Sequence, residues 1–490
     1  MMKRIFVIIL FCKCCFVLCL PTVFAKAVAS QKWEKSLVDI EISQKRYDYF
    51  QPWAPRNEII EKQGVVVNGN FILTTAQYFN NSINIRIRKG GVGKWWDAEV
   101  KTIDYHANLA LIRPKAQQFF DGLVPISISE KLPVNGQIDI IRWRENLIEL
   151  RKAEITRPVI KPSVTSWLAY LHLEANCDIE GAGWSEISVL DSRLCGLVES
   201  QDGTTLTIIT ASMIKHFLKG ATSASYRGLG YFDFVWMKGQ NPDSLAWLGQ
   251  TNPAKGVIVI DFAGRQRTNS LIQRGDVIVK IDGFEIDSEG YYKDPRYGRL
   301  LLEHLATFNK WAGDSIKIEL IRNGSVTNVN YVIPKANFTD ELVPFAVYDK
   351  EAEYYIAGGL IFQPLIIPFL KSWGSDWERK APFRLAYYTR QKPTDDYQSR
   401  VFLFMVLPDR YNIGYQDCRF MVVDKINGVK IQNLKDVKHA FENPTDTVHI
   451  IEFAKGEQVQ RIVLDASEFQ SATRRILQNY GILYQYVISN

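Results

Sequence analysis

The sequence is poor in cysteine, and this scarcity argues against a disulfide-stapled fold. It has seven cysteines in 490 residues, and four of them fall in the N-terminal stretch "FCKCCFVLC". The other three are an odd number and too few for a disulfide scaffold. We expect them to be buried thiols: Cys177, Cys195 and Cys418.

Strong charge and clustered histidine are missing too. The formal net charge of +6 falls to +3 without Lys3, Arg4 and Lys13, which is too weak a bias to indicate nucleic-acid binding. The six histidines are scattered without metal-ligand spacing. The glycine-rich "KGGVGK" leads into a strand pattern rather than a helix, so it predicts a turn and no phosphate site. We therefore expect no metal and no cofactor.

Long apolar runs occur only at the N-terminus. Residues 1–25 combine a basic start, an apolar stretch and small residues at Val23 and Ala25, which is typical of a cleaved export signal. Lys13 interrupts the apolar stretch, and the alternative is an uncleaved membrane anchor. No later segment has a comparable apolar run, so we expect membrane contact only through such an anchor. The expected location is periplasmic or otherwise extracytoplasmic.

Short apolar runs broken by turn signals fill residues 30–220, as in "GVVVNGNFILTTA" and "LTIIT". Alternating strands at this spacing predict an all-β barrel or a pair of barrels. The Asn-Gly of "VNGN" tolerates the positive φ of a tight hairpin turn. "ASMIKHFLK" predicts a closing helix.

Two later segments share one pattern. Residues 221–336 mix strands with a predicted helix near Tyr297 to Asn309, and residues 419–464 repeat the order of strand, Asn/Asp-Gly turn, short strand and helix. This repetition indicates two related α+β modules separated by an irregular, aromatic-rich stretch.

Three motifs give the chain a resemblance to the Deg/HtrA family of trypsin-like proteases with PDZ modules. The box that carries the family's histidine is "FILTTAQYF" here, with Gln77 at that position. The aspartate box is "DYHANLALI", with Asn108 at the catalytic aspartate. The serine loop is "GAGWSE", with Gly183 at the nucleophile. The segment "GGLIFQPLIIPFL" is similar to one before the second module of plant members.

The resemblance implies a mainly β fold: a trypsin-like double β-barrel followed by two α+β PDZ-like modules. The implied divisions are an export signal at 1–25, the barrels at 30–220, a PDZ domain at 221–336, and a second PDZ-like domain with its preceding linker at 337–490.

All three triad positions lack the side chains that catalysis needs. A glutamine amide takes up no proton near neutral pH, an asparagine does not stabilise an imidazolium by charge, and glycine has no nucleophilic oxygen. The oxyanion region, at Gly181 and Trp184, is altered as well, because Trp184 stands where the family has glycine. A rebuilt pair of Ser185 and His106 is disfavoured, because each lies two residues from the required position. We expect a solvated loop serine and a surface histidine.

The first PDZ module keeps a recognisable peptide-binding loop. PDZ domains add a peptide as a strand and hold its carboxylate on backbone N–H groups of a glycine-containing loop. "YRGLGYFDF" matches that loop, with Gly228, Leu229, Gly230 and Tyr231 at the carboxylate end. The alternative is a plain turn before a strand. The second module has no clear equivalent loop and is expected to serve packing or assembly.

These observations predict an exported pseudoprotease. It would bind unfolded or C-terminal peptide segments as a chaperone, a scaffold or a regulator of an active relative. The alternative is an active serine endopeptidase with an unconventional site. The resemblance also implies trimers, and an aromatic cluster before the first clear strand is a candidate contact, unless it covers the base of its own barrel: Trp33, Tyr47, Tyr49, Phe50 and Trp53.

Overall fold

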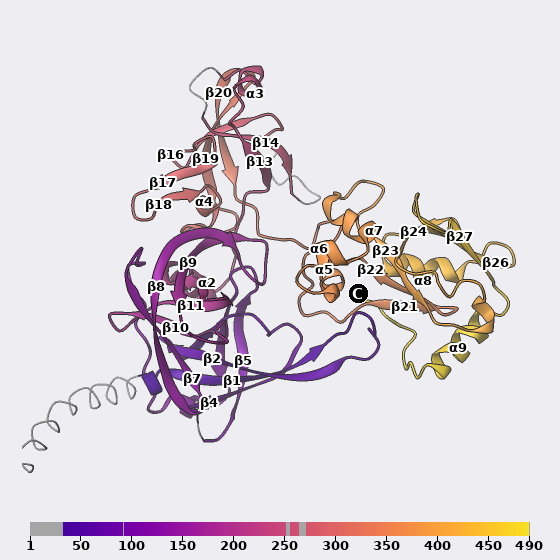
Figure 1. Ribbon diagram of the computed structural model, residues 1–490, viewed down its shortest axis with the longest axis horizontal. Coiled ribbons are helices and arrows are strands. Elements are labelled where there is room, and N and C mark those ends of the chain that lie inside the picture. Colours follow the sequence, from indigo (N-terminus) through magenta and orange to yellow (C-terminus); the bar gives the residue numbers. More distant parts are fainter. Residues whose placement is uncertain (1–32, 92, 251–254, 264–270, 490) are drawn as a thin grey trace, which may run out of the picture.

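The computed structural model describes residues 33–91, 93–250, 255–263 and 271–489. Two six-stranded barrels come first, closed in the orders β1-β2-β3-β6-β5-β4 and β10-β11-β12-β9-β8-β7 (Figure 1). The predicted export signal lies outside the described residues.

The strands of the first barrel are β1 (Leu37–Arg46), β2 (Arg56–Val67), β3 (Phe71–Thr74), β4 (Ser82–Lys89), β5 (Trp96–Asp104) and β6 (Leu109–Pro114). Those of the second are β7 (Gln137–Arg144), β8 (Leu147–Pro162), β9 (Ala169–Cys177), β10 (Ile187–Leu190), β11 (Arg193–Asp202) and β12 (Thr205–Thr210). A 3-10 turn, Gln117–Phe120, joins them.

Local sequence explains the turns and the closing helix. Gly69 and Asn70 both have positive φ (88° and 58°), as the "VNGN" hairpin requires. Helix α2 (Ala211–Ala221) begins after Thr210, whose side chain accepts the Met213 N–H. The predicted barrels and closing helix are therefore confirmed.

The first α+β unit follows as a sheet in the order β13-β14-β15-β19-β20, with β16 beside β15 and a separate β17-β18 pair. Its core is continuous with that of the second barrel, because Leu173 and Phe234 belong to one cluster of buried side chains. The elements are β13 (Phe234–Lys238), α3 (Pro242–Trp247), β14 (Val257–Phe262), β15 (Val277–Ile281), β16 (Phe284–Glu285), β17 (Tyr291–Asp294), β18 (Gly298–Leu301), α4 (His304–Thr307), β19 (Ser315–Arg322) and β20 (Ser325–Val332).

The helix predicted near Tyr297 to Asn309 was mostly wrong. Residues 298–301 form β18, and only the four residues of α4 are helical. The pairing of β18 with β17 decides this, because Tyr292 and Leu300 are cross-strand partners and both are buried.

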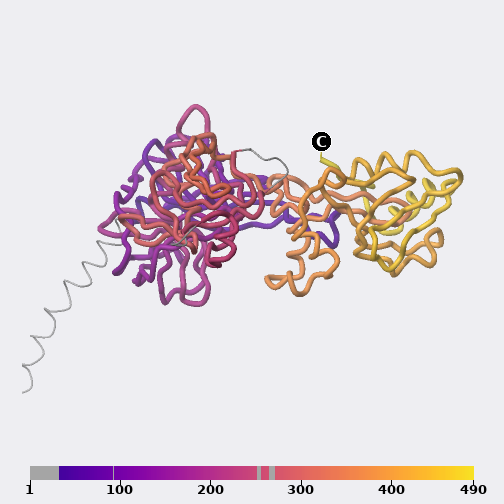
Figure 2. The backbone as a smooth tube through the Cα atoms, turned by 90° about the horizontal axis from the view of Figure 1, so that it is seen from above, coloured from indigo at the N-terminus to yellow at the C-terminus, as the bar shows by residue number. Residues whose placement is uncertain are grey.

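The last unit is a sheet in the order β27-β26-β24-β23-β22-β21-β28, with β25 beside β24. It lies apart from the barrels in both views (Figures 1 and 2). Its strands are β21 (Tyr354–Ala357), β22 (Leu360–Pro364), β23 (Val401–Val406), β24 (Met421–Ile426), β25 (Val429–Lys430), β26 (Val448–Phe453), β27 (Arg461–Asp465) and β28 (Tyr486–Val487). Its helices are α5 (Ile367–Leu370), α6 (Trp377–Lys380), α7 (Phe383–Tyr387), α8 (Leu434–Glu442) and α9 (Phe469–Asn479), with 3-10 turns at Lys371–Trp373, Tyr388–Arg390 and Arg410–Asn412.

The β1–β2 hairpin reaches from the first barrel to this last unit, as the indigo tube in Figure 2 shows. At its tip the Phe50 ring lies 5.2 Å from Trp373 and 6.0 Å from Phe369. The Trp53 ring lies 6.1 Å from Tyr354. The tip aromatics Phe50 and Trp53 thus pack on the last unit of their own chain rather than on the base of the barrel.

Candidate functional site

The three positions that the resemblance assigns to a catalytic triad lie on loops between strands of the two barrels. Gln77 follows β3, Asn108 precedes β6, and Gly183 lies between β9 and β10. The Gln77 backbone N–H donates to Asn108 Oδ1 at 3.0 Å. The first two positions therefore touch, but through a backbone amide rather than through the two side chains.

A buried charged network fixes the other end of Asn108. Its Nδ2 donates to Glu199 Oε2 at 2.9 Å, and Ser163 Oγ donates to the same oxygen at 2.8 Å. His172 Nε2 lies 3.1 Å from Glu199 Oε1. Burial acts to raise the pKa of Glu199, but His172 and these donors outweigh it and hold the pKa below its usual value. Asn108 is thus a structural link between a loop and a buried carboxylate.

Sequence reasoning missed Glu199 and the role of His172. The available signal was a polar residue inside each of two apolar strand patterns, "LCGLVES" and "LAYLHLEA". A charged residue in a buried strand needs a partner, but the sequence does not say which one.

At Gly183, the predicted nucleophile position, the backbone conformation disfavours a serine. Gly183 has φ 115°, a conformation that side-chain-bearing residues rarely adopt. A Cβ built there would lie 3.2 Å from Ser200 Cα and 3.4 Å from the Glu199 carbonyl oxygen. Gly183 therefore has no nucleophilic side chain, and its backbone would strain one.

Glu186 occupies the donors next to this position. Its Oε2 accepts the backbone N–H groups of Gly183 and Trp184, each at 2.9 Å. The residue is 1% exposed, and its Oε1 lies 3.7 Å from Arg142 Nη1. Burial raises its pKa, and the amides and Arg142 oppose that rise. The chain's own carboxylate therefore takes two amides that an anionic intermediate would need.

The remaining oxyanion-region residues have structural contacts of their own. The Trp184 ring stacks on Tyr78 at 5.0 Å with an interplanar angle of 12°. The Gly181 carbonyl accepts a hydrogen bond from Arg142 Nη1 at 3.2 Å. Tyr78 directly follows the base position, so the stacked rings bridge two of the three degenerate loops.

Ser185 is not the solvated serine expected from the sequence. It is fully buried, and its Oγ lies 2.7 Å from Thr75 Oγ1 and accepts the Thr75 N–H at 2.9 Å. His106 is half-buried rather than at the surface, and its Nδ1 lies 2.8 Å from Ser166 Oγ. Each has separate partners, so no nucleophile–base pair forms between them.

Lys62 lies beneath the same loops, and the sequence analysis did not identify it as a site residue. Its Nζ donates to Thr75 Oγ1, the Thr75 carbonyl and the Gln77 carbonyl at 2.6 to 3.0 Å. Burial lowers its pKa to about 7, and Glu186 opposes that shift. Three acceptors match the three N–H groups of a protonated amine, so Lys62 ties the base-position loop to β2.

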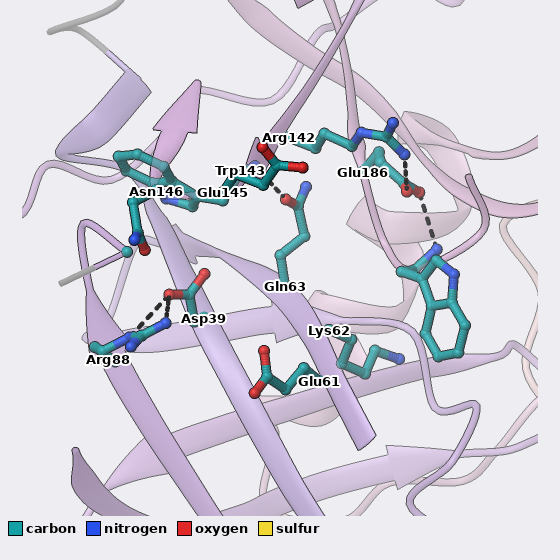
Figure 3. A pocket seen from close by; sticks show the side chains of 12 residues that line it. Asp39, Glu61, Lys62, Gln63, Arg88, Arg142, Trp143, Glu145, Asn146 and Glu186 are labelled. Atoms are coloured by element: carbon teal, nitrogen blue, oxygen red, sulfur yellow. Dashed lines mark hydrogen bonds and ion pairs between the residues drawn. The ribbon is translucent and has the colours of Figure 1, made fainter. Parts of the chain in front are cut away.

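A pocket of about 340 Å³ opens beside the former nucleophile loop (Figure 3). Its lining is mostly charged: Glu186 and Arg142 meet on one side, and Arg88 pairs with Asp39 at 2.9 Å on the other. Such a lining suits polar peptide groups better than an apolar side chain.

The loop predicted to hold a peptide carboxylate is only partly available. The Tyr231 N–H donates to the Pro334 carbonyl at 3.2 Å, and the Leu229 carbonyl accepts the Ala336 N–H at 2.9 Å. Leu229 is buried, and Gly228 has φ 81°. Gly230 is bridged to Lys335 in antiparallel fashion. Gly230 itself is buried.

Within the described parts of the chain, no helix is long and apolar enough to cross a membrane. The same residues contain no group of three His, Cys, Asp or Glu side chains placed to hold a metal ion.

Comparison with known proteins gives matches along most of the chain. A family profile described as "PDZ domain" matches residues 343–486. The second module, where the sequence gave no clear binding loop, thus carries the family match. The chain is 23% identical to "Putative protease Do-like 3, mitochondrial" of Arabidopsis thaliana, over 88% of this chain and 76% of that protein. It is 23% identical to "Protease Do-like 2, chloroplastic" of the same organism, over 89% and 72%.

Among solved structures, "HtrA-type protease AlgW with decapeptide" matches with a TM-score of 0.48 and 14% identity. That match covers 64% of this chain and 99% of the other.

Proposed function

We propose that this chain, a homologue of the Deg/HtrA-type serine proteases that carries a PDZ domain, is a pseudoprotease that binds polypeptides without cleaving them. The observation that carries the proposal is the loop around Gly183. Its positive φ and the close Ser200 and Glu199 backbone would strain a serine there, and Glu186 accepts the neighbouring amides. Loss of a triad member costs about four to six orders of magnitude in rate. Here the backbone amides that would stabilise an oxyanion are altered as well.

The proposed ligands are unfolded segments or free C-termini of other polypeptides. The protein would act as a chaperone, a scaffold or a regulator assembled with an active relative. The export-signal pattern at residues 1–25 supports a location outside the cytoplasm. Trimer formation remains a prediction from family resemblance alone.

Purified residues 26–490 test the proposal. We expect no hydrolysis of unfolded casein above background and no labelling by a fluorophosphonate, together with suppressed aggregation of reduced, unfolding insulin. The matched control is Ser185→Ala. Hydrolysis that this change abolishes would establish the alternative, an active endopeptidase with an unconventional site. Hydrolysis that it leaves intact would reveal another nucleophile, and unsuppressed aggregation would contradict the binding role.

The Gly228–Tyr231 loop of the first module is the proposed carboxylate site. The support for this proposal is the match of "YRGLGYFDF" to such a loop, while the Tyr231 amide is already engaged by the Pro334 carbonyl. We expect the full chain to bind peptides with free apolar C-termini more tightly than their amidated forms, because amidation removes the charge. Equal binding of both forms, measured by calorimetry, would exclude a carboxylate site.

A further inference from the structure

The outer edge of β21 in the last unit is covered by a segment from far along the chain. β28 pairs antiparallel with β21, with Tyr354 opposite Val487 and Tyr355 opposite Tyr486. The Ile356 N–H donates to the Gln485 carbonyl at 2.9 Å, and Gln485 Nε2 donates to the Ile356 carbonyl at 3.0 Å. Residues 484–489 therefore add a strand to a sheet edge.

Helix α8 flanks the same segment. The Tyr486 ring stacks on Tyr355 at 5.7 Å, and Lys438 Nζ of α8 donates to Tyr486 Oη at 3.2 Å. Tyr355 in turn stacks on Phe441 of α8 at 6.1 Å. Residues 484–489 thus lie on the open edge of a sheet beside a helix, the geometry in which PDZ domains add a peptide strand.

We propose that residues 484–489 are an internal occupant of a strand-addition site on β21, and that a polypeptide ligand binds there by taking their place. This inference rests on the proposed polypeptide-binding function and names a site and a mode of control for it.

The contacts of the segment define the ligand chemistry. Tyr486 lies against Tyr355 and α8, and Ile488, two residues on, packs against the core of the same unit. Val487 packs on the other side, against the cluster that contains Phe369. Because alternate residues of a strand face the same way, the site fits an extended segment with an aromatic residue two places before an aliphatic one.

The strand pairing of the occupant is short, although the Tyr354 hydroxyl donates to the Tyr484 carbonyl at 3.0 Å and the Ser489 N–H donates to Glu353 Oε1 at 2.6 Å. Only two residue pairs join it to β21, and Leu483 and Tyr484 are 88% and 69% exposed. A pocket of about 550 Å³ adjoins Ile488 and Ser489 and leaves room for a longer strand. A tethered segment has an effective concentration on the order of millimolar, so it masks the site from a micromolar ligand without being part of the sheet core.

The probe is a dye-labelled peptide with the sequence of residues 484–490, YQYVISN, added to the chain that lacks those residues. We expect fluorescence anisotropy to show binding to the truncated chain, and at least tenfold weaker binding to the full chain. The control peptide replaces its Val487 by proline, which lacks the N–H for strand pairing, and should not bind either chain.

The full-length Val487→Pro chain provides a second host of unchanged length. It should bind the probe as the truncated chain does. Equal binding to truncated and full chains, or no binding by a truncated chain that circular dichroism shows to be folded, would overturn the proposal. So would unfolding of both hosts, because β28 would then be an integral strand. If the wild-type chain suppresses insulin aggregation in any of these cases, the proposed function is not contradicted. Only the inference about residues 484–489 then fails.

Discussion

At the scale of single residues, Asn108, at the predicted aspartate position, has a clear structural role. Its Oδ1 accepts the Gln77 N–H and its Nδ2 donates to Glu199. Its φ of 51° is one that asparagine, aspartate and glycine tolerate. An aspartate at position 108 would tolerate this φ. It would, however, place a carboxylate oxygen where the Asn108 amide now donates a hydrogen bond to Glu199.

We therefore expect Asn108→Asp to lower the free energy of unfolding by about 3–5 kcal/mol at pH 7, because an uncompensated buried charge results. The pair of carboxylates binds a proton in the folded variant that the unfolded chain releases, so the folded pKa is raised. The variant should regain stability as pH falls from 7 toward 5. Urea unfolding followed by tryptophan fluorescence measures both effects.

Asn108→Gly is the matched control, since it keeps the backbone tolerance and removes the hydrogen bonds without adding charge. Its loss of stability should not recover over the same pH interval. Identical pH profiles for the two variants would contradict the like-charge explanation.

At the scale of elements, the loop of residues 181–186 is a folded unit with its own internal acceptor. Glu186 holds the Gly183 and Trp184 amides, and Trp184 stacks on Tyr78. The loop keeps this shape through hydrogen bonds and packing, so replacing one side chain leaves the backbone where it is.

The triple change Gln77→His, Asn108→Asp and Gly183→Ser should therefore produce no fluorophosphonate labelling. A serine at φ 115° is strained, and the amides stay bound to Glu186. We expect labelling only when the whole loop of residues 181–186 is replaced by Gly-Asn-Ser-Gly-Gly-Pro in addition to Gln77→His and Asn108→Asp. Strong labelling of the triple variant would mean that only side chains had been lost.

At the scale of the whole molecule, contacts between the barrels and the last unit fix their arrangement. The β1–β2 hairpin tip contacts Phe369 and Trp373. Beside it, the Tyr105 ring stacks on Tyr348 at 4.2 Å, and Tyr105 Oη donates to Asp349 at 3.0 Å. Tyr105 is three residues before Asn108 in the sequence, so the segment before the last unit packs on the loop that leads to Asn108.

Loss of the hairpin contacts should make the barrels and the last unit unfold at different temperatures. We expect the double variant Phe50→Ala and Trp53→Ala to show a lower-temperature calorimetric transition for the last unit, because removing large half-buried aromatics costs on the order of 2–4 kcal/mol each. Ile59→Ala is the control, since Ile59 lies on the same hairpin but is 62% exposed. An unchanged single transition in the double variant would show that the hairpin does not couple the parts.

Local signals in the sequence were enough to predict the barrels, the "VNGN" turn, helix α2 and the positions of the three motifs. Periodicity and turn chemistry act between near neighbours, so they can be read from the chain itself. The absence of triad chemistry at Gln77, Asn108 and Gly183 stays a prediction, which rests on residue identity and on the family resemblance.

Only the tertiary structure decided which residues surround the three predicted triad positions. Asn108 and Glu199 are 91 residues apart, the Gln363 side chain donates to the Tyr49 carbonyl across 314 residues, and β28 pairs with β21 across some 130 residues. A buried charge, an aromatic cluster and an open strand edge each require a partner, but the folded path of the chain determines which residue comes close enough to supply it.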